Sequence, residues 1–385
     1  MRTRAVHAGY EADAQTGAVS PPIYQTATFA FESAEQGAAR FAHEDAGYIY
    51  TRYGNLTTRV VEERMAALEG AEAALATASG MAAIATVLLG LLRYGDHVVA
   101  TDALYTATRV LLTQTLPGLG VTCTVVDGAS PDAVAKAIRP NTRAIYTETP
   151  GNPTLKLVEL EPVARIGREH GITTITDSTF ATPVNLRPIE HGIDLVVHSA
   201  TKYLGGHGDI IGGIICGSRE MIDRLWSTHI QVGGSMSPLN AFLLARGLQT
   251  LPLRMAAHND NARRIAEFLA GHSAVQRVIY PGLPSHPQHD LARREMDGFG
   301  GMVCFELVGG IEAGRRLMNS VKLCTLAVSL GDVKTLISHP ASMTHSLLSA
   351  QERAEAGISE GLVRLSVGIE DPDDLIADLD QALTS

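Results

Sequence analysis

Cysteine is scarce in this chain, and its four cysteines show no CxxC spacing of the kind found in metal or redox motifs. Three of the four lie within apolar runs, so we expect reduced thiols in the core of a cytoplasmic protein, with neither disulfides nor a metal site. The four are Cys123, Cys216, Cys304 and Cys324.

Positive charge is also in deficit, because 31 Lys and Arg residues face 41 Asp and Glu residues and leave a formal net charge of -10. Surfaces that bind nucleic acid or acidic membranes are normally rich in Lys and Arg. No apolar run approaches the length needed to cross a membrane, and the opening stretch, MRTRAVHAGYEADAQTG, lacks the apolar core of a signal peptide. We therefore expect a small soluble ligand, and neither nucleic acid nor a membrane as partner.

What the chain does contain is a lysine between an apolar strand and a glycine-rich loop. Residues 194–213 read DLVVHSATKYLGGHGDIIGG, and the one lysine among them is Lys202. Burial disfavours an ammonium, so a lysine in this setting should have a lowered pKa and act as a nucleophile toward carbonyls. A lysine beyond a strand end can also simply extend to solvent, and the neighbouring residues have to decide between the two.

An acidic residue, Asp177, ends the preceding β-branched stretch GITTITD. At the carboxyl end of a strand in an α/β sheet, such a residue faces the ligand crevice, although an isolated Asp there could equally serve a turn or a helix cap. Pyridoxal 5'-phosphate (PLP) enzymes combine a Schiff-base lysine with a carboxylate that pairs with the pyridinium nitrogen. Asp177 and Lys202 together therefore predict PLP as the cofactor.

Strands and helices alternate over residues 73–216, which predicts right-handed crossovers and a mainly parallel sheet covered by helices. Ligands of such an α/β fold bind at the carboxyl edge of the sheet. A long helical region at 239–269, with a bend expected at Leu251-Pro252, precedes a smaller α+β module. The expected strands are 73–78, 97–100, 121–126, 144–147, 172–176, 195–197, 213–216, 275–280, 302–307, 327–330 and 362–367. The other expected helices are 57–69, 82–92, 105–116, 131–138, 160–170, 312–318 and 373–383.

The length of 385 residues favours two domains, and the first 56 residues add an arm. We expect an N-terminal arm at 1–56, a large PLP-binding domain at 57–250 and a C-terminal α+β domain at 251–385. The arm shows little periodicity and many turn formers, so it must lie on another surface, for which a neighbouring subunit is a natural candidate. Its segment YIYTRYGN includes Tyr50 and Arg52, which could form an aromatic interface patch or reach a phosphate.

Further candidate ligand residues follow other predicted strands. Ser79, Gly80 and Met81 open a helix whose N–H groups and dipole favour a phosphate, although any tight strand-to-helix turn also favours glycine. Tyr105 could stack on a cofactor ring or serve only in packing. Arg364 lies inside an apolar strand and needs an anion, which could be an internal carboxylate or the carboxylate of a substrate.

Several separated motifs resemble those of the cystathionine gamma-synthase-like, or Cys/Met-metabolism, family of PLP enzymes. They occur in order over nearly the whole chain, as YTRYGNLTT, ATASGMAA, ETPGNP, TDSTFATP, HSATKYLGGHGD, SLGD, HPASMTH and GLVRLSVGIED. The resemblance implies the aspartate-aminotransferase type I fold, pyridoxal 5'-phosphate as cofactor, and a homotetramer built as a dimer of dimers.

The same resemblance implies roles for individual residues. As catalytic residues, Lys202 would bind the cofactor covalently, Asp177 would pair with the pyridine nitrogen, and Tyr105 would stack on the ring. The substrate carboxylate would meet Arg364 and the region of Ser329. The remaining cofactor contacts would come from Gly80, Met81, Asn152, Ser199 and Thr201, and from Tyr50 and Arg52 of the neighbouring subunit.

Within the family, the C-terminal half most resembles methionine gamma-lyases, notably in GGMVCFELVGGIEAGRR and AVSLGDVKTLISHPASMTH. Ile49, Val110 and Val328 are apolar where cystathionine gamma-lyases tend to have charged side chains, which suits a thioether methyl and leaves a charged arm unpaired. Two features depart from the methionine gamma-lyase pattern. Ala107 replaces a typical cysteine, and a Lys-Asp pair near His229-Ile230 is missing.

We therefore expect a PLP-dependent carbon–sulfur lyase that converts L-methionine to methanethiol, 2-oxobutanoate and ammonia by γ-elimination. Cystathionine gamma-lyase is an alternative, as are the γ-replacement enzymes cystathionine gamma-synthase and O-acyl-homoserine sulfhydrylase, because they share the early steps. An alternative of another class is a non-catalytic phospho-ligand-binding protein, which the intact set of Lys202, Asp177 and Arg364 disfavours.

Overall fold

Short stretches of small and β-branched residues form the larger of two sheets in the computed structural model, which describes residues 1–343, 351 and 358–384. This sheet has seven strands in the order β1-β7-β6-β5-β4-β2-β3. Only β7 runs antiparallel to its neighbours, so the predicted mainly parallel α/β sheet is confirmed. The strands are β1 Ala73–Thr77, β2 His97–Thr101, β3 Thr122–Val126, β4 Thr142–Glu148, β5 Thr173–Asp177, β6 Leu195–Ser199 and β7 Gly213–Gly217.

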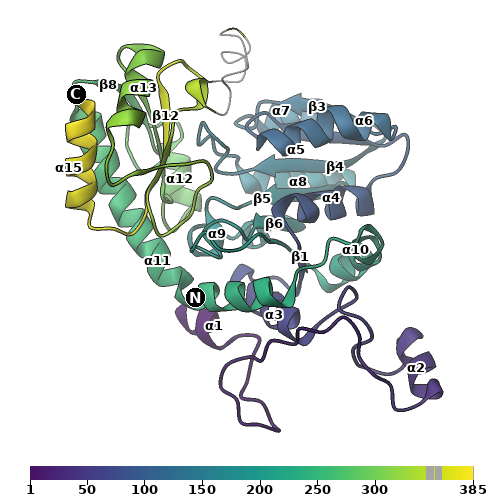
Figure 1. Cartoon of the computed structure of the whole chain (residues 1–385). Helices are drawn as coiled ribbons and strands as arrows, with labels where there is room; N and C mark the ends of the chain where they lie inside the picture. Colours follow the sequence, from purple (N-terminus) through teal and green to yellow (C-terminus); the bar gives the residue numbers. More distant parts are fainter. Residues whose placement is uncertain (344–350, 352–357, 385) are drawn as a thin grey trace.

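Helices cover both faces of this sheet and form two separate apolar cores with it (Figure 1). One core includes α4 Gly80–Leu91 and α10 Arg219–Val232. The other includes α3 Leu56–Glu69 and α8 Leu160–His170. Shorter helical pieces complete the layers, namely α5 Thr106–Val110, a π-helical turn Leu111–Thr115, α6 Leu116–Gly118, α7 Pro131–Lys136, α9 Thr182–Asn185 and a 3-10 turn Pro188–His191.

Local capping signals set the ends of the helices that the sequence predicts best. The Asn55 side chain accepts the N–H of Thr57 at the start of α3, and Gly70 ends the helix in the left-handed conformation. Gly171 ends α8 in the same way. The predictions for α3 and α8 are confirmed, whereas α10 is a helix that the sequence analysis did not predict.

The N-terminal arm contains two short helices, α1 Arg2–His7 and α2 Ala34–Phe41, which the sequence analysis also did not predict. Figure 1 shows α2 and its flanking loops extending away from the two sheets. Several apolar side chains of the arm are exposed in this single chain, among them Val19, Ile23 and Phe41.

The smaller sheet has the strand order β10-β11-β12-β9-β8. Its strands are β8 Val275–Ile279, β9 Met302–Leu307, β10 Thr325–Leu326, β11 Leu336–Ser338 and β12 Leu362–Ser366. The helices α12 His289–Glu295, α13 Gly310–Ser320 and α15 Pro372–Leu383 and a 3-10 turn Pro340–Ser342 accompany it. The motif HPASMTH begins at this turn, but its last residues, 344 and 345, lie outside the described residues.

The predicted strand at 327–330 is wrong. Strand β10 ends at Leu326, and Ser329 takes a left-handed backbone conformation with φ of 82°. The chain leaves the sheet here because Ser329 turns toward Lys202, while the N–H of Gly331 donates to Ser366 Oγ at 2.8 Å. The apolar composition of residues 327–330 was therefore not sufficient to form a strand.

The long helix α11 Pro238–Gly271 joins the two sheets. Its first part packs in the core beside α3, and its last part packs in the core of the smaller sheet. Pro252 lies inside the helix, and Figure 1 shows α11 changing direction along its length. No helix of the described residues has both the length and the apolar composition needed to span a membrane.

All four cysteines are free thiols, and three of them, Cys216, Cys304 and Cys324, are buried as expected. Cys123 is only partly buried. Burial raises the pKa of the Cys123 thiol to about 11, so this thiol is protonated at neutral pH.

A buried pair of side chains, His198 and Glu69, connects helix α3 to strand β6, which precedes Lys202. His198 Nε2 lies 3.0 Å from Glu69 Oε2, and both side chains are fully inaccessible to solvent. Burial raises the pKa of Glu69, while the hydrogen bond from His198 acts in the opposite direction. Removing one partner of such a pair leaves the other polar group buried and unpaired.

We expect Glu69→Ala to destabilise the protein by about 3–5 kcal/mol, because His198 would lose its buried partner. Glu63→Ala is the matched control on the same helix, since Glu63 pairs with Arg59 at the surface and such pairs contribute only about 0–1 kcal/mol. Urea unfolding followed by circular dichroism at equal protein concentrations measures both changes. Equal unfolding midpoints for the two variants would contradict the prediction.

Candidate active site

Lys202 lies just beyond β6, in the turn that the glycine-rich loop forms. Its ammonium does not extend freely to solvent, because Nζ donates to Ser329 Oγ at 2.6 Å and the side chain is partly buried. Burial lowers the pKa of Lys202 to about 8, with a smaller contribution from the positive charge of Arg364. A substantial fraction of the amine is therefore neutral near physiological pH, which a nucleophile requires.

Arg364, from β12 of the smaller sheet, lies beside this lysine. Its Nη2 donates to the carbonyl oxygen of Ser329 at 3.1 Å, and its Nη1 donates to Asn152 Oδ1 at 3.3 Å. No carboxylate of residues 1–343, 351 and 358–384 forms an ion pair with it. The internal salt bridge, one of the two alternatives for Arg364, is therefore excluded within those residues. The guanidinium remains able to donate hydrogen bonds to the carboxylate of a ligand.

Asp177 ends β5 at the carboxyl edge of the larger sheet, as predicted. Its Oδ1 accepts the N–H of Thr179 at 2.9 Å and the hydroxyl of the same residue at 2.5 Å. Its Oδ2 has no hydrogen-bond partner in the described chain, so one oxygen can accept from a ligand. Burial raises the pKa of Asp177, and the hydrogen bonds from Thr179 oppose that shift.

Glu148 is a residue of the candidate site that the sequence analysis did not name. It ends β4 and pairs in register with Asp177 on the adjacent strand. Its Oε2 accepts the N–H of Tyr105 at 2.7 Å, and its Oε1 accepts the N–H of Asn152 at 3.2 Å. Burial and the nearby charge of Asp177 raise the pKa of Glu148. The signal was present, because Glu148 begins the motif ETPGNP at a strand end.

The first turn of α4 lies directly against Ser199 at the end of β6. Ser79 caps this helix by accepting the N–H of Ala82 at 3.0 Å. A Cβ atom at Gly80 would lie 2.8 Å from the Cβ of Ser199, so only glycine allows this close approach. Free N–H groups at the helix N-terminus and the Ser199 hydroxyl therefore form a small cradle suited to a phosphate.

Two more residues that were predicted to bind the phosphate, Met81 and Thr201, are close in sequence to Gly80 and Ser199. Met81 Sδ lies 3.8 Å from Thr108 Oγ1, a contact that links α4 to the helix following Tyr105. Thr201 Oγ1 accepts the N–H of Gly212 at 3.1 Å. The hydroxyl of Thr201 is thus held by the backbone of its own loop.

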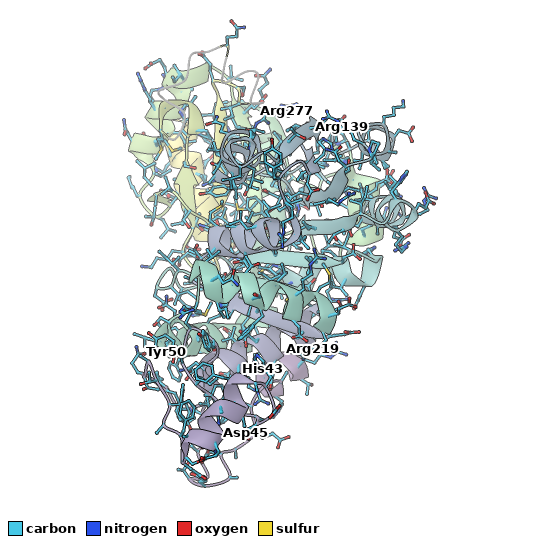
Figure 2. All side chains as sticks on the ribbon, turned by 90° about the vertical axis from the view of Figure 1, so that its right-hand side faces the viewer. His43, Asp45, Tyr50, Arg139, Arg219 and Arg277 are labelled. Carbon is cyan, nitrogen blue, oxygen red and sulfur yellow. The ribbon has the colours of Figure 1, made fainter. Side chains whose placement is uncertain are left out.

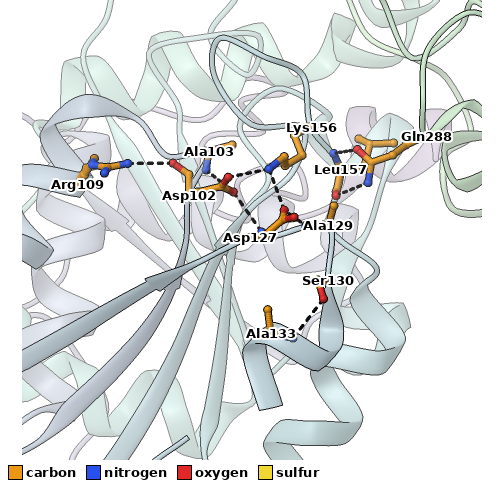
Figure 3. Close-up of polar contacts among 11 residues, drawn as sticks. Asp102, Ala103, Arg109, Asp127, Ala129, Ser130, Ala133, Lys156, Leu157 and Gln288 are labelled. Carbon is orange, nitrogen blue, oxygen red and sulfur yellow. Dashed lines mark hydrogen bonds and ion pairs between the residues drawn. The ribbon is translucent and has the colours of Figure 1, made fainter. Parts of the chain in front are cut away.

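A polar cluster holds the loop that carries Asn152 (Figure 3). Lys156 Nζ lies 2.7 Å from Asp102 Oδ2 and 2.8 Å from Asp127 Oδ1, so this one ammonium joins the ends of three neighbouring strands. Next to it, Gln288 from the smaller sheet's side makes two reciprocal hydrogen bonds with the backbone of Leu157, at 2.8 and 2.7 Å. These contacts connect the edge of the larger sheet to the C-terminal part of the chain.

Three predicted site residues on the arm are not brought to Lys202 within this chain. Arg52 Nη1 donates to the carbonyl oxygen of Ile230 at 2.6 Å, and its guanidinium lies over the rings of Tyr50 and Tyr53. Figure 2 shows Tyr50 at the end of the molecule that also carries His43 and Asp45. The backbone of Ile49 pairs with Phe29 of the arm itself.

The remaining predicted residues are apolar or aromatic groups with open surfaces. Val110 of α5 is 40% exposed and Val328, next to Ser329, is 58% exposed. Tyr105 is 46% exposed although Glu148 holds its backbone. These open side chains are accessible to a ligand at the edge of the sheet.

These residues fit pyridoxal 5'-phosphate on the evidence of their own geometry. The partly neutral amine of Lys202 suits an aldehyde, the free oxygen of Asp177 suits a protonated ring nitrogen, and the cradle at Gly80 suits a phosphate. The sheet order and this arrangement define a PLP-dependent enzyme with the aspartate-aminotransferase type I fold.

The chain belongs to the family of Cys/Met metabolism PLP-dependent enzymes, which it matches over residues 2–384. It is 50% identical to an L-methionine gamma-lyase of Fusobacterium nucleatum subsp. polymorphum, over 100% of this chain and 98% of that protein. It is 52% identical to an L-methionine gamma-lyase of Pseudomonas putida, over 99% and 96% of the two chains. The crystal structure of cystathionine gamma-lyase from Lactobacillus plantarum complexed with L-serine is similar with a TM-score of 0.93, at 40% identity over 100% and 98%.

We expect the amine of Lys202 in cofactor-free protein to react with acetic anhydride with a rate that is half-maximal near pH 8. Only the neutral amine reacts, so the rate rises as pH increases through the lowered pKa, whereas an ordinary lysine titrates near about 10.4. Mass spectrometry of the labelled peptides measures this rate, and the exposed Lys334 provides an internal reference in the same sample. A half-maximal rate at pH 10 or above would show that Lys202 is solvated like a surface lysine.

Proposed function

We propose that this enzyme cleaves L-methionine by γ-elimination to methanethiol, 2-oxobutanoate and ammonia. The observation that carries the proposal is the apolar character of two exposed side chains, Val110 on the helix that follows Tyr105 and Val328 next to Ser329. Val110 and Val328 offer contact to a thioether methyl and no partner for a charged distal arm. The names of relatives at about half identity support the same reaction.

The proposed roles begin with substrate binding. Arg364 would bind the substrate carboxylate, because its guanidinium has no fixed carboxylate partner among the described residues. Asn152 and Ser329 would orient that guanidinium through the hydrogen bonds they already make with it. Binding at this point would place the substrate Cα near the amine of Lys202, which shares Ser329 with Arg364.

Proton transfer would be the work of Lys202 and Tyr105. When bound, pyridoxal phosphate supplies an electron sink, and Asp177 would keep its ring nitrogen protonated through the free oxygen. Lys202 would take the proton from the substrate Cα, and its lowered pKa lets the same amine give that proton back. Tyr105 would stack over the ring and donate a proton to the departing sulfur, with its backbone held by Glu148.

Phosphate binding would involve groups from two subunits. Gly80, Met81, Ser199 and Thr201 would contact the phosphate from the same chain. Tyr50 and Arg52 would come from the neighbouring subunit, which is consistent with Arg52 binding the carbonyl oxygen of Ile230 within its own chain. Ile49 would accompany them and add an apolar wall on the substrate side.

A homotetramer built as a dimer of dimers would cover the exposed apolar groups of the arm. We assign residues 1–56 to that arm, 57–250 to the large PLP-binding domain and 251–385 to the C-terminal domain. The free thiols support a reducing compartment such as the cytoplasm.

We expect kcat/KM for L-methionine to exceed that for L-cystathionine by about tenfold or more, because a buried polar group without a partner costs about 1–3 kcal/mol and a charged group costs more. Both substrates yield 2-oxobutanoate, so one assay for that product compares them directly. Val328→Glu is expected to lower the ratio of kcat/KM for methionine to kcat/KM for cystathionine, because it weakens methionine binding. A preference of the unmodified enzyme for cystathionine would favour cystathionine gamma-lyase instead, and release of no product from any sulfur amino acid would favour a non-catalytic binder.

Mixing inactive Arg52→Ala chains with inactive Lys202→Ala chains should restore activity, since one site of each hybrid dimer would contain both native residues. Random exchange should recover up to about a quarter of the native activity per chain. The control mixture pairs Arg364→Ala with Lys202→Ala, whose residues share one chain's site, and it should stay inactive. If the first mixture stays inactive although mass spectrometry shows that subunits exchange, Arg52 does not serve a neighbouring site.

A further inference from the structure

Helix α11 carries three polar side chains on a buried face where apolar residues are usual. Arg254, His258 and Asn261 follow a spacing of four and three residues, which places them along one side of the helix. All three are buried. Burying such groups is unfavourable unless each finds hydrogen-bond partners, so their partners reveal what the face contacts.

Arg254 binds the turn that carries Lys202. Its Nη1 donates to the carbonyl oxygen of Tyr203 at 2.7 Å, and its Nη2 donates to that of Leu204 at 3.3 Å. The guanidinium also donates to the helix itself, at the carbonyl oxygen of Gly247 and at Thr250 Oγ1. No carboxylate pairs with it in the described part of the chain. A Cβ atom at Gly206 would overlap this guanidinium, which shows how closely the loop approaches it.

His258 and Asn261 bind the end of the strand that carries Arg364. His258 Nδ1 lies 2.7 Å from the carbonyl oxygen of Val367, and burial lowers the pKa of this histidine to about 4. The ring is therefore neutral with its proton on Nδ1. Asn261 Nδ2 donates to the carbonyl oxygens of Gly368 at 3.1 Å and Glu370 at 2.7 Å.

Lys202 and Arg364 cannot hold each other in place, because both are cations and repel one another. They share Ser329 as a direct partner. The two residues also come from different sheets, and α11 packs in the cores of both. The backbone of Val333 joins the two regions, because its N–H donates to Gly206 and its carbonyl oxygen accepts from Ile369, both at 2.9 Å. The polar face of α11 adds a second connection, because it contacts the backbone beside each of the two residues.

We propose that Arg254, His258 and Asn261 are positioning residues that hold Lys202 and Arg364 at a defined separation through one rigid helix. Arg254 orients the lysine turn, while His258 and Asn261 orient the end of β12. The proposal rests on the proposed function, in which Lys202 transfers the Cα proton and Arg364 binds the carboxylate. Arg254, at one end of this helix face, should then affect kcat, while Asn261, at the other end, should affect KM.

The test compares Arg254→Lys with Asn261→Leu in the holoenzyme. A lysine cannot reach both Tyr203 and Gly247, so Arg254→Lys should lower kcat by about ten- to a hundredfold, the effect of displacing a reacting group by roughly 1 Å, with little change in KM. Asn261→Leu should instead raise KM severalfold with a smaller effect on kcat. Arg263→Lys is the matched control, because Arg263 lies on the same helix but makes only surface ion pairs.

Hydrogen exchange supplies a readout that does not depend on activity. The N–H of Gly206 donates to the carbonyl oxygen of Lys202 at 2.8 Å and should exchange at least about tenfold faster in Arg254→Lys. The N–H of Val367 donates to the carbonyl oxygen of Gly301 at 2.8 Å and should exchange faster in Asn261→Leu. Each variant should leave the other reporter amide unchanged.

A lower melting temperature of Arg254→Lys with unchanged kcat and unchanged exchange at Gly206 would overturn the proposal and leave a purely structural role. If Arg254→Lys does not fold, Thr250→Ala replaces it in the test, because this change removes only the partner of the guanidinium Nε. Thr250→Ala should lower kcat by less than is expected for Arg254→Lys and should leave KM unchanged. The proposal would be overturned if Thr250→Ala changed KM by the same factor as kcat, or if it changed neither constant. Kinetics use whichever sulfur amino acid the native enzyme turns over best, so a wrong substrate assignment appears in the native enzyme and not in the variants.

Discussion

The constraint on which the site depends is that four ionisable groups gather at one edge of a sheet and none of them forms a direct ion pair with another. Two are the cations Lys202 and Arg364, and two are the carboxylates of Asp177 and Glu148. Burial lowers the pKa of both cations and raises the pKa of both carboxylates. Backbone N–H groups, carbonyl oxygens and hydroxyls hold them instead, so each retains capacity for a ligand.

The two sheets contribute different parts of this arrangement. Parallel strands β4, β5 and β6 end together, which brings Glu148, Asp177 and the turn of Lys202 to one edge. Arg364 arrives from the smaller sheet, and Ser329 reaches both cations only by taking a left-handed conformation. Helix α11 connects the two halves (Figure 1). The hydrogen bonds between Gln288 and Leu157 connect them as well (Figure 3).

Much of the fold followed from local signals. The Asn55 cap and Gly70 delimit α3, and the apolar stretch of β9 was predicted at its observed bounds, because capping and burial act over a few residues. Helix α10 was missed although Ser218 caps it and Gly233 ends it. Strand β11 has only three residues, which are too few for any periodicity. The apolar stretch at 327–330 leaves the sheet where Ser329 contacts Lys202.

The sequence by itself determined which residues stand at strand ends with the right chemistry: Lys202, Asp177, Gly80 and, inside a strand, Arg364. Motifs supply this information because strand periodicity and turn residues are local properties. Only the tertiary structure decided that Ser329 holds Lys202, that Glu148 binds the backbone of Tyr105 and Asn152, and that Arg254 supports the lysine turn. Three of these contacts, those of Ser329 with Lys202, Glu148 with Tyr105 and Arg254 with Tyr203, join residues 127, 43 and 51 positions apart. Such hydrogen bonds form only where folding brings the distant atoms within about 3 Å.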